Sequence, residues 1–197
     1  MTNNSILLVF IKNFIVFNFV RYLQYLIPVE NIKIFKNEII LIVIPEILLK
    51  IIEFLKLHTS SQYKMLTCIS GTDYPEYSNR FEVVYELMSL VYNHRLRIKI
   101  YVNELIFVSS LTSLFPSANW WEREIWDLFG IYFVNHPDLR RILTDYGFEG
   151  YPLKKCFPLT GYVEVRYNEN QKRVFCEPIK QLTQEFKFFK FSSPWKN

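Results

Sequence analysis

The amino-acid stretch RFEVVYELMSLVYNHRLRIKIYV, residues 80–102, decides the fold class. Over Arg95–Val102, apolar and polar side chains alternate strictly, which is the period-2 pattern of a β-strand with one buried face. Arg80–Tyr92 alternates enough to predict a second strand, and Asn93-His94 between the two predicts a hairpin turn. An antiparallel hairpin therefore forms the centre of the predicted fold.

Helices and further strands flank this hairpin. The pattern predicts strands at Asn31–Phe35, Glu38–Ile44 and Tyr63–Ser70, helices at Ser5–Leu26, Pro45–His58 and Ala118–Phe129, a helical turn at Leu111–Leu114, and a second hairpin from Tyr162–Tyr167 and Arg173–Glu177. This order predicts an α+β fold: a mostly antiparallel sheet flanked by helices, with a long ordered loop and an extended C-terminal tail. We expect two regions, an α+β domain with its N-terminal helix at 1–130 and a docking loop, hairpin and aromatic tail at 131–197.

Composition limits the function classes. Half of the residues are hydrophobic and 18% are aromatic, which is enough for a large core and leaves apolar surface for a permanent partner. The net charge of +4 is too small and too dispersed to indicate a nucleic-acid binder. No phosphate-binding glycine motif occurs. Three cysteines at irregular spacing predict neither a disulfide framework nor an iron–sulfur cluster, and they fit a reducing compartment.

The N-terminal segment is apolar but interrupted. Lys12, Asn13 and Asn18 break the run Ile6–Val20, whereas a membrane-spanning helix needs about 20 mostly apolar residues. It also lacks the basic start and the small-residue cleavage site of a signal peptide. The prediction is a helix that packs in the core or against a neighbour, with membrane insertion as the alternative.

Residues 119–161, NWWEREIWDLFGIYFVNHPDLRRILTDYGFEGYPLKKCFPLTG, begin as a helix that ends at Gly130 and continue as a long irregular stretch. Irregular stretches beyond about 15 residues are usually functional or disordered. This one is too rich in apolar residues to be a solvated linker. It therefore predicts a segment that packs against another surface, either of this chain or of a different one.

Several groups in this stretch admit a catalytic interpretation. Glu122, Glu124 and Asp127 resemble paired acids, although acids early in a helix also complement its dipole and pair with arginines. His136 beside Asp138 suggests a hydrolase, but no nucleophile elbow accompanies them, and a histidine before proline commonly fixes a turn. A metal site from His136, Cys156 and, further along the chain, Cys176 would have irregular spacing and lack a fourth ligand. The structural interpretation is preferred in each case.

The same stretch carries a family resemblance. ERE at 122–124, DLFGI at 127–131, HPDLRRILTDYGF at 136–148 and FPL at 157–159 resemble the 30-kilodalton subunit of respiratory complex I, also called subunit nine of mitochondrial NADH dehydrogenase. The likeness continues through GYVEVRY at 161–167 to SPW at 193–195, and weakly back to Tyr63, whereas the first 60 residues match only in general character. Lys154-Lys155-Cys156 and Tyr151 depart from the family pattern.

The resemblance implies a non-catalytic subunit of the peripheral arm of proton-pumping NADH:ubiquinone oxidoreductase. It implies no catalytic, cofactor-binding or metal-binding residue on this chain, with FMN and iron–sulfur clusters on partner subunits. The implied partners are other peripheral-arm subunits, above all the large subunit that forms the quinone pocket, and nucleic acid is not among them. The implied location is the matrix side of the mitochondrial inner membrane, with membrane association only through the complex.

The composition predicts a mitochondrial gene, because a folded chain with a single alanine indicates an A/T-biased genome, as many organelle genomes are. The product of such a gene needs no import presequence. The general alternative is a scaffold or an RNA-binding module. The residues expected to dock on partners are Glu122, Arg123, Glu124, Asp127, His136, Asp138, Arg140, Arg141, Asp145, Tyr146, Phe157, Phe186, Phe189 and Trp195.

Overall fold

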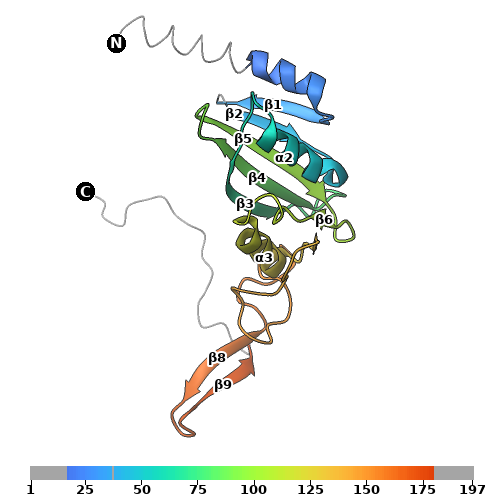
Figure 1. Ribbon diagram of the computed structural model, residues 1–197. Coiled ribbons are helices and arrows are strands. Elements are labelled where there is room, and N and C mark those ends of the chain that lie inside the picture. Colours follow the sequence, from blue (N-terminus) through green and yellow to red (C-terminus); the bar gives the residue numbers. More distant parts are fainter. Residues whose placement is uncertain (1–16, 37, 180–197) are drawn as a thin grey trace, which may run out of the picture. The chain divides into compact units, whose positions relative to one another are not determined.

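A computed structural model of the chain describes residues 17–36 and 38–179. The described residues form two compact units, the first ending at Lys155 and the second beginning at Cys156. The first unit contains a five-stranded sheet with the order β1-β2-β5-β4-β3 (Figure 1). Its strands are β1 (Asn31–Phe35), β2 (Glu38–Ile42), β3 (Met65–Asp73), β4 (Phe81–Ser89) and β5 (His94–Val102). Every neighbouring pair is antiparallel except β2 with β5, which confirms the α+β class and the mostly antiparallel sheet.

Helices complete the first unit. Residues 17–26 are helical, and the predicted helix at Pro45 divides into η1 (Pro45–Ile47) and α2 (Leu48–Leu57). Helix α3 spans Ala118–Phe129, as predicted. Two short parallel strands, β6 (Val108–Ser109) and β7 (Phe133–Val134), bracket α3, and the second unit holds the hairpin of β8 (Val163–Asn168) and β9 (Arg173–Pro178).

The core lies between one face of the sheet and α2, which crosses that face in Figure 1. The alternation read from the sequence places Leu96, Ile98 and Ile100 of β5 inside, where all three are fully buried. Helix α2 buries Ile52 and Leu55 against the same cluster. On the other face of the sheet, cross-strand ion pairs join Arg97 to Glu86 and Glu38, and Lys99 to Glu82.

Strand β3 runs to Asp73, three residues past the predicted end at Ser70. A glycine follows the predicted end, but the strand continues through it, and Gly71 pairs with Val83 of β4. A side chain at Gly71 would stand 3.0 Å from the ring of Phe129. The glycine therefore marks a close approach of α3 to the sheet rather than the end of the strand.

Two other expectations differ from the structure. The central hairpin turns at residues 90–93, earlier than the predicted turn at Asn93-His94, because β4 ends at Ser89 and β5 already begins at His94. The parallel pair β6–β7 was not predicted, because two-residue strands carry no period that a sequence can show. Residues 5–16 of the predicted N-terminal helix lie outside the described residues. Within residues 17–36 and 38–179, no helix combines the length and the apolar character that crossing a membrane requires.

Candidate docking site

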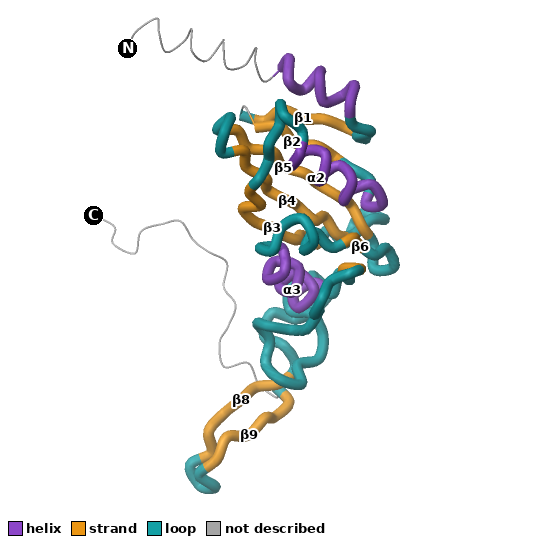
Figure 2. The backbone as a smooth tube through the Cα atoms, in the orientation of Figure 1, coloured by secondary structure: helices purple, strands orange, loops and turns teal. Residues whose placement is uncertain are grey.

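The candidate site is the docking segment, defined here as helix α3 and the irregular chain that follows it, residues 118–155. Figure 2 shows this chain as loop beside α3. The helix forms because Ala118, Ile125 and Phe129 recur on one face, and all three are buried. Gly130 ends it in the left-handed region (φ 76°), and its N–H donates to Trp126 O.

Asp127 is the centre of the docking segment. Its side chain is fully buried. Oδ2 accepts hydrogen bonds from three consecutive backbone N–H groups, those of Ile142, Leu143 and Thr144, at 3.2, 2.7 and 2.9 Å. Oδ1 accepts the Thr144 hydroxyl at 2.6 Å. Burial by itself would raise the pKa of Asp127, but these donors outweigh it and hold the pKa below its ordinary value. One helix carboxylate therefore fixes the course of the loop.

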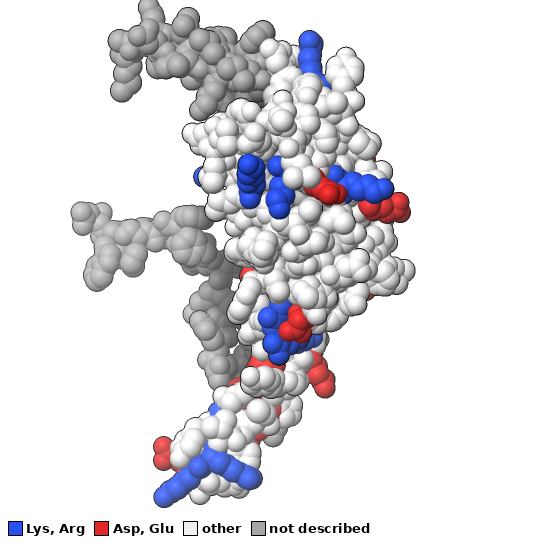
Figure 3. Space-filling model, viewed as in Figure 1, with Lys and Arg blue, Asp and Glu red and all other residues white. Residues whose placement is uncertain are grey.

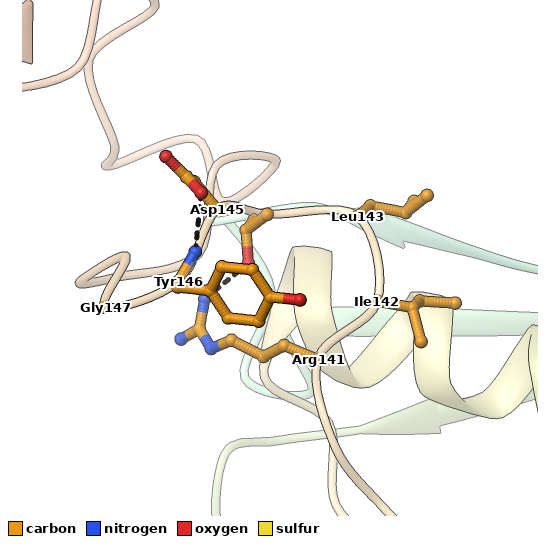
Figure 4. A pocket seen from close by; sticks show the side chains of 7 residues that line it. Arg141, Ile142, Leu143, Asp145, Tyr146 and Gly147 are labelled. Carbon is orange, nitrogen blue, oxygen red and sulfur yellow. Dashed lines mark hydrogen bonds between the residues drawn. The ribbon is translucent and has the colours of Figure 1, made fainter. Parts of the chain in front are cut away.

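Arg141 also contacts Asp127 and joins it to a later part of the loop. Its guanidinium lies 3.4 Å from Asp127 Oδ1 and donates to Gly150 O at 2.9 Å. It also stacks against the ring of Tyr151, 5.0 Å from the ring centre. A groove of about 500 Å³ follows residues 141–147, and Figure 4 shows the Asp145 carboxylate accepting the Tyr146 N–H at its rim.

Glu122 occupies a second buried position on α3. Its carboxyl is fully buried and accepts the Ser110 hydroxyl at 2.6 Å and the Leu111 N–H at 2.7 Å, which tie α3 to the chain after β6. Burial raises the pKa of Glu122 to about 7, and the two hydrogen bonds only partly oppose it. The Tyr85 hydroxyl, also buried, has its pKa raised by burial and by Glu122.

His136 is held on both ring nitrogens. Nδ1 accepts the Asp138 N–H at 3.1 Å, which leaves Nε2 to donate to Asn119 O at 3.2 Å. Its side chain is buried, and Nε2 lies 4.0 Å from the Glu122 carboxylate. His136 therefore fixes the turn, as its place before a proline predicted, and it does not have the free nitrogen that a general base needs.

Backbone contacts pin the rest of the docking segment. Arg123 donates to Arg140 O at 3.1 Å, so it holds the loop through a backbone carbonyl. At the end of the segment, the Lys155 N–H donates to Asp73 Oδ2 at 2.7 Å. Asp73 is itself buried and paired with Arg80, whose Nη2 lies 2.7 Å from Oδ2. The loop is thus joined to the end of β3.

The predicted docking residues fall into separate groups. Glu122 and Asp127 are fully buried, so any part they play in docking runs through the segment they hold in place. Asp138, Arg140, Asp145 and Tyr146 are exposed, and Arg140 pairs with Asp138 at 2.9 Å. Phe157 belongs to the second unit, where its ring contacts Tyr162. Phe186, Phe189 and Trp195 lie outside the described residues.

The exposed part of the docking segment is apolar as well as charged. Leu143 is 60% exposed and Tyr146 is fully exposed, although both belong to a loop whose backbone is fixed. Figure 3 shows that, on the face in view, Lys, Arg, Asp and Glu form small groups of mixed sign separated by uncharged surface. Fixed apolar side chains beside paired charges are typical of a protein interface.

Sequence reasoning missed Thr144 and Tyr151. Thr144 completes the hydrogen bonds of Asp127, and the ring of Tyr151 occupies the space where a side chain at Gly130 would stand, 2.7 Å away. No local sequence pattern indicates either contact, because Thr144 and Tyr151 each lie 17 or more residues along the chain from the residue that they contact. The glycine at 130 showed the helix end but not the ring that packs on it.

A metal site would require several His, Cys, Asp or Glu side chains to converge. Within residues 17–36 and 38–179, no group of three His, Cys, Asp or Glu side chains is placed to hold a metal ion. Cys68 is half-buried in β3, whereas Cys156 and Cys176 are exposed in the second unit.

Comparison with known proteins completes this description. Residues 41–163 match the family described as the respiratory-chain NADH dehydrogenase, 30 Kd subunit. The chain belongs to this family. The match includes the last two residues of β2, strands β3, β4 and β5, helix α3 and the whole docking segment.

Two relatives and one solved fragment agree with the family, and a further solved structure shares the fold. A protein of Arabidopsis thaliana named NADH dehydrogenase [ubiquinone] iron-sulfur protein 3 is 59% identical over 149 residues, 76% of this chain and 78% of that one. NADH-ubiquinone oxidoreductase subunit 9 of Reclinomonas americana is 56% identical over 161 residues, 82% and 78% of the two chains. The trypsin-resistant fragment (1-134) of Nqo5 aligns with a TM-score of 0.50 at 32% identity, over 55% of this chain and 89% of its own. An archaeal membrane-bound sulfane sulfur reductase shares the fold, with a TM-score of 0.63 at 19% identity over 79% of this chain and 96% of that one.

Proposed function

We propose that this chain is a non-catalytic core subunit of the peripheral arm of a proton-pumping NADH:ubiquinone oxidoreductase. The observation that carries the proposal is the docking segment, a family-matched stretch whose irregular backbone is fixed from inside while Leu143, Tyr146 and Arg140 face outward. A loop that is rigid before it binds loses little conformational entropy on docking. The docking segment therefore fits a permanent interface between subunits.

The partners follow from this assignment. The docking segment contacts other peripheral-arm subunits, principally the large subunit that forms the quinone pocket. FMN and the iron–sulfur clusters belong to partner chains, and this chain supplies assembly and support. The complex holds it on the matrix side of the mitochondrial inner membrane. The relatives of Arabidopsis thaliana and Reclinomonas americana are named as subunits of a ubiquinone-linked NADH dehydrogenase or oxidoreductase, which supports the assignment to this complex.

The alternatives fit the geometry less well. A hydrolase would need His136 to face a substrate, but its side chain is buried and both of its nitrogens contact backbone groups. An RNA-binding module would need a continuous basic surface, whereas the docking segment pairs its arginines with Asp127, Asp138 and backbone carbonyls.

Native gel electrophoresis of mitochondria solubilised in mild detergent tests the proposal. Mass spectrometry of peptides then locates this chain, and an in-gel stain locates NADH dehydrogenase activity. Comigration in one large complex is expected. A small species that carries this chain away from the activity would overturn the proposal. Arg140→Ala should lower the amount of assembled complex, whereas the control Lys50→Ala, at an exposed position of α2, should leave it unchanged.

A further inference from the structure

The hairpin of β8 and β9 has its apolar face turned to solvent. Residues directly opposite one another on paired strands lie on the same face of the hairpin. By this register, one face consists of Val163 with Pro178, Val165 with Cys176, and Tyr167 with Val174. All six are exposed, and the three valines and Tyr167 are 56–63% exposed. We call these six residues the hairpin face.

The opposite side of the hairpin is polar and satisfied by its own contacts. Glu164 stands opposite Glu177, and Arg166 donates two hydrogen bonds of 3.2 Å to Glu177, which offsets the repulsion between the two carboxylates. Arg173 lies over the ring of Phe175, 4.3 Å from its centre. The charged side therefore has partners within the hairpin, whereas the described residues leave the six side chains of the uncharged side exposed.

This arrangement is unfavourable for a hairpin alone in water. An isolated two-stranded hairpin is marginally stable at best, and the usual pattern turns the apolar face toward a core. Here the strict alternation of Val163-Glu164-Val165-Arg166-Tyr167 would suit a strand that is buried on one side. The sequence is consistent with a structure in which something covers the hairpin face.

Size and charge identify the covering surface. Each strand is six residues long. With a rise of about 3.4 Å per residue and strands about 4.8 Å apart, one side of the hairpin has an area of roughly 200 Å². A stable pair of proteins needs about 800 Å² on each side, so this face alone is too small to join two copies of the chain. It carries no charged residue, so phosphates and lipid headgroups would find no partner on it.

We propose that the hairpin face docks on an uncharged, apolar surface of another subunit of the complex, as a second contact in addition to that of the docking segment. This inference rests on the proposed function, because only a partner that also holds the chain elsewhere makes so small a face sufficient. The hairpin then acts as a clamp whose register is fixed by its polar side and whose affinity comes from its apolar side.

Cys176 provides a native probe, because it lies within the hairpin face and is exposed. The intact complex is solubilised in mild detergent and treated with N-ethylmaleimide. It is then isolated on a native gel, and mass spectrometry measures the rate at which Cys176 is modified. The same measurement is made on the separately expressed full chain. A thiol reacts only when reagent reaches it, so we expect a rate at least about tenfold lower in the complex than in the free chain.

A photo-crosslinking residue in place of Val174 identifies what covers the face, with Arg173 on the opposite side as the matched control position. The expected product joins position 174, and not position 173, to another subunit. Equal Cys176 rates in the complex and the free chain would overturn the inference. So would crosslinks from position 174 to residues 180–197 of the same chain or to a second copy. Comigration is scored before labelling, so failure of the proposed function is distinguished from failure of this inference alone.

Discussion

The docking segment and the β8–β9 hairpin differ in where their polar groups and their apolar side chains go. The docking segment has almost no regular secondary structure after α3, yet Asp127 alone engages three of its backbone N–H groups. The hairpin has a complete backbone ladder, yet its apolar side faces solvent. Regular secondary structure is therefore a poor guide to whether a segment is stable alone. The number of buried, satisfied contacts is the better one.

The largest expected effect comes from Asp127→Ala. The variant leaves three backbone N–H groups and the Arg141 guanidinium without their buried acceptor, so we expect the free energy of unfolding to fall by about 3–5 kcal/mol. Urea unfolding of the expressed chain measures this. If the stability of the variant stays within 1 kcal/mol of wild type (an order-of-magnitude bound for surface sites), the docking segment is not held from inside and the comparison fails.

Glu122 gives the next largest effect, as a pH dependence. Its pKa is about 7 in the folded chain against an ordinary 4.5, so the folded state holds a proton that the unfolded state releases between these values. Stability should therefore fall by about 3 kcal/mol as pH rises from 4.5 to 7. Glu122→Gln keeps a carbonyl for Leu111 N–H and an amide for Ser110, so its unfolding profile should lose this slope. Parallel slopes in the two proteins would contradict the buried state of Glu122.

Variants of two neighbouring arginines distinguish a residue that stabilises the fold of this chain from one that contacts a partner subunit. Arg141→Ala removes a guanidinium bound to Asp127 and Gly150 O, so we expect a loss of about 1–2 kcal/mol in the isolated chain. Arg140→Ala removes an exposed ion pair with Asp138 and should change stability by less than about 0.5 kcal/mol. Urea unfolding and native gels of both variants give the answer. Equal destabilisation by the two would mean that both arginines serve the fold.

The smallest expected effect on the isolated chain comes from Val165→Thr with Val174→Thr. Threonine keeps the β-branched shape but adds a hydroxyl to the hairpin face, which is already in water, so the change in stability should stay below about 0.5 kcal/mol. The same pair should lower the yield of assembled complex. The matched control, Asn168→Thr with Arg173→Thr, alters the opposite side and should assemble normally.

Much of the fold could be predicted from local patterns. The period-2 alternation over Arg95–Val102 and the apolar face of Leu48–Leu57 are short-range signals, and both elements formed where expected. The β2–β5 parallel pairing and the extension of β3 through Gly71 depend on contacts distant in sequence, so no local pattern shows them. For the same reason, the sequence indicated the acids of α3 but not which of them are buried.

The candidate site was predicted as a stretch of chain and less well as a set of side chains. Family resemblance located Glu122, Asp127 and His136, but helical spacing does not tell whether an acid faces solvent or a returning loop. The loop that buries Asp127 comes back to it at Thr144, 17 residues later. Only the three-dimensional path of the chain decides this.

The contact between Asp73 and the Lys155 N–H has a consequence for the order of folding. It joins residues 82 apart, whereas the contacts of Asp127 join residues 15–17 apart. The entropy of loop closure rises with loop length, so the short contacts form early and the long one forms late. During synthesis, α3 and its loop can therefore organise themselves as soon as residue 144 is available. Attachment to the end of β3 waits until residue 155, and it completes the first unit.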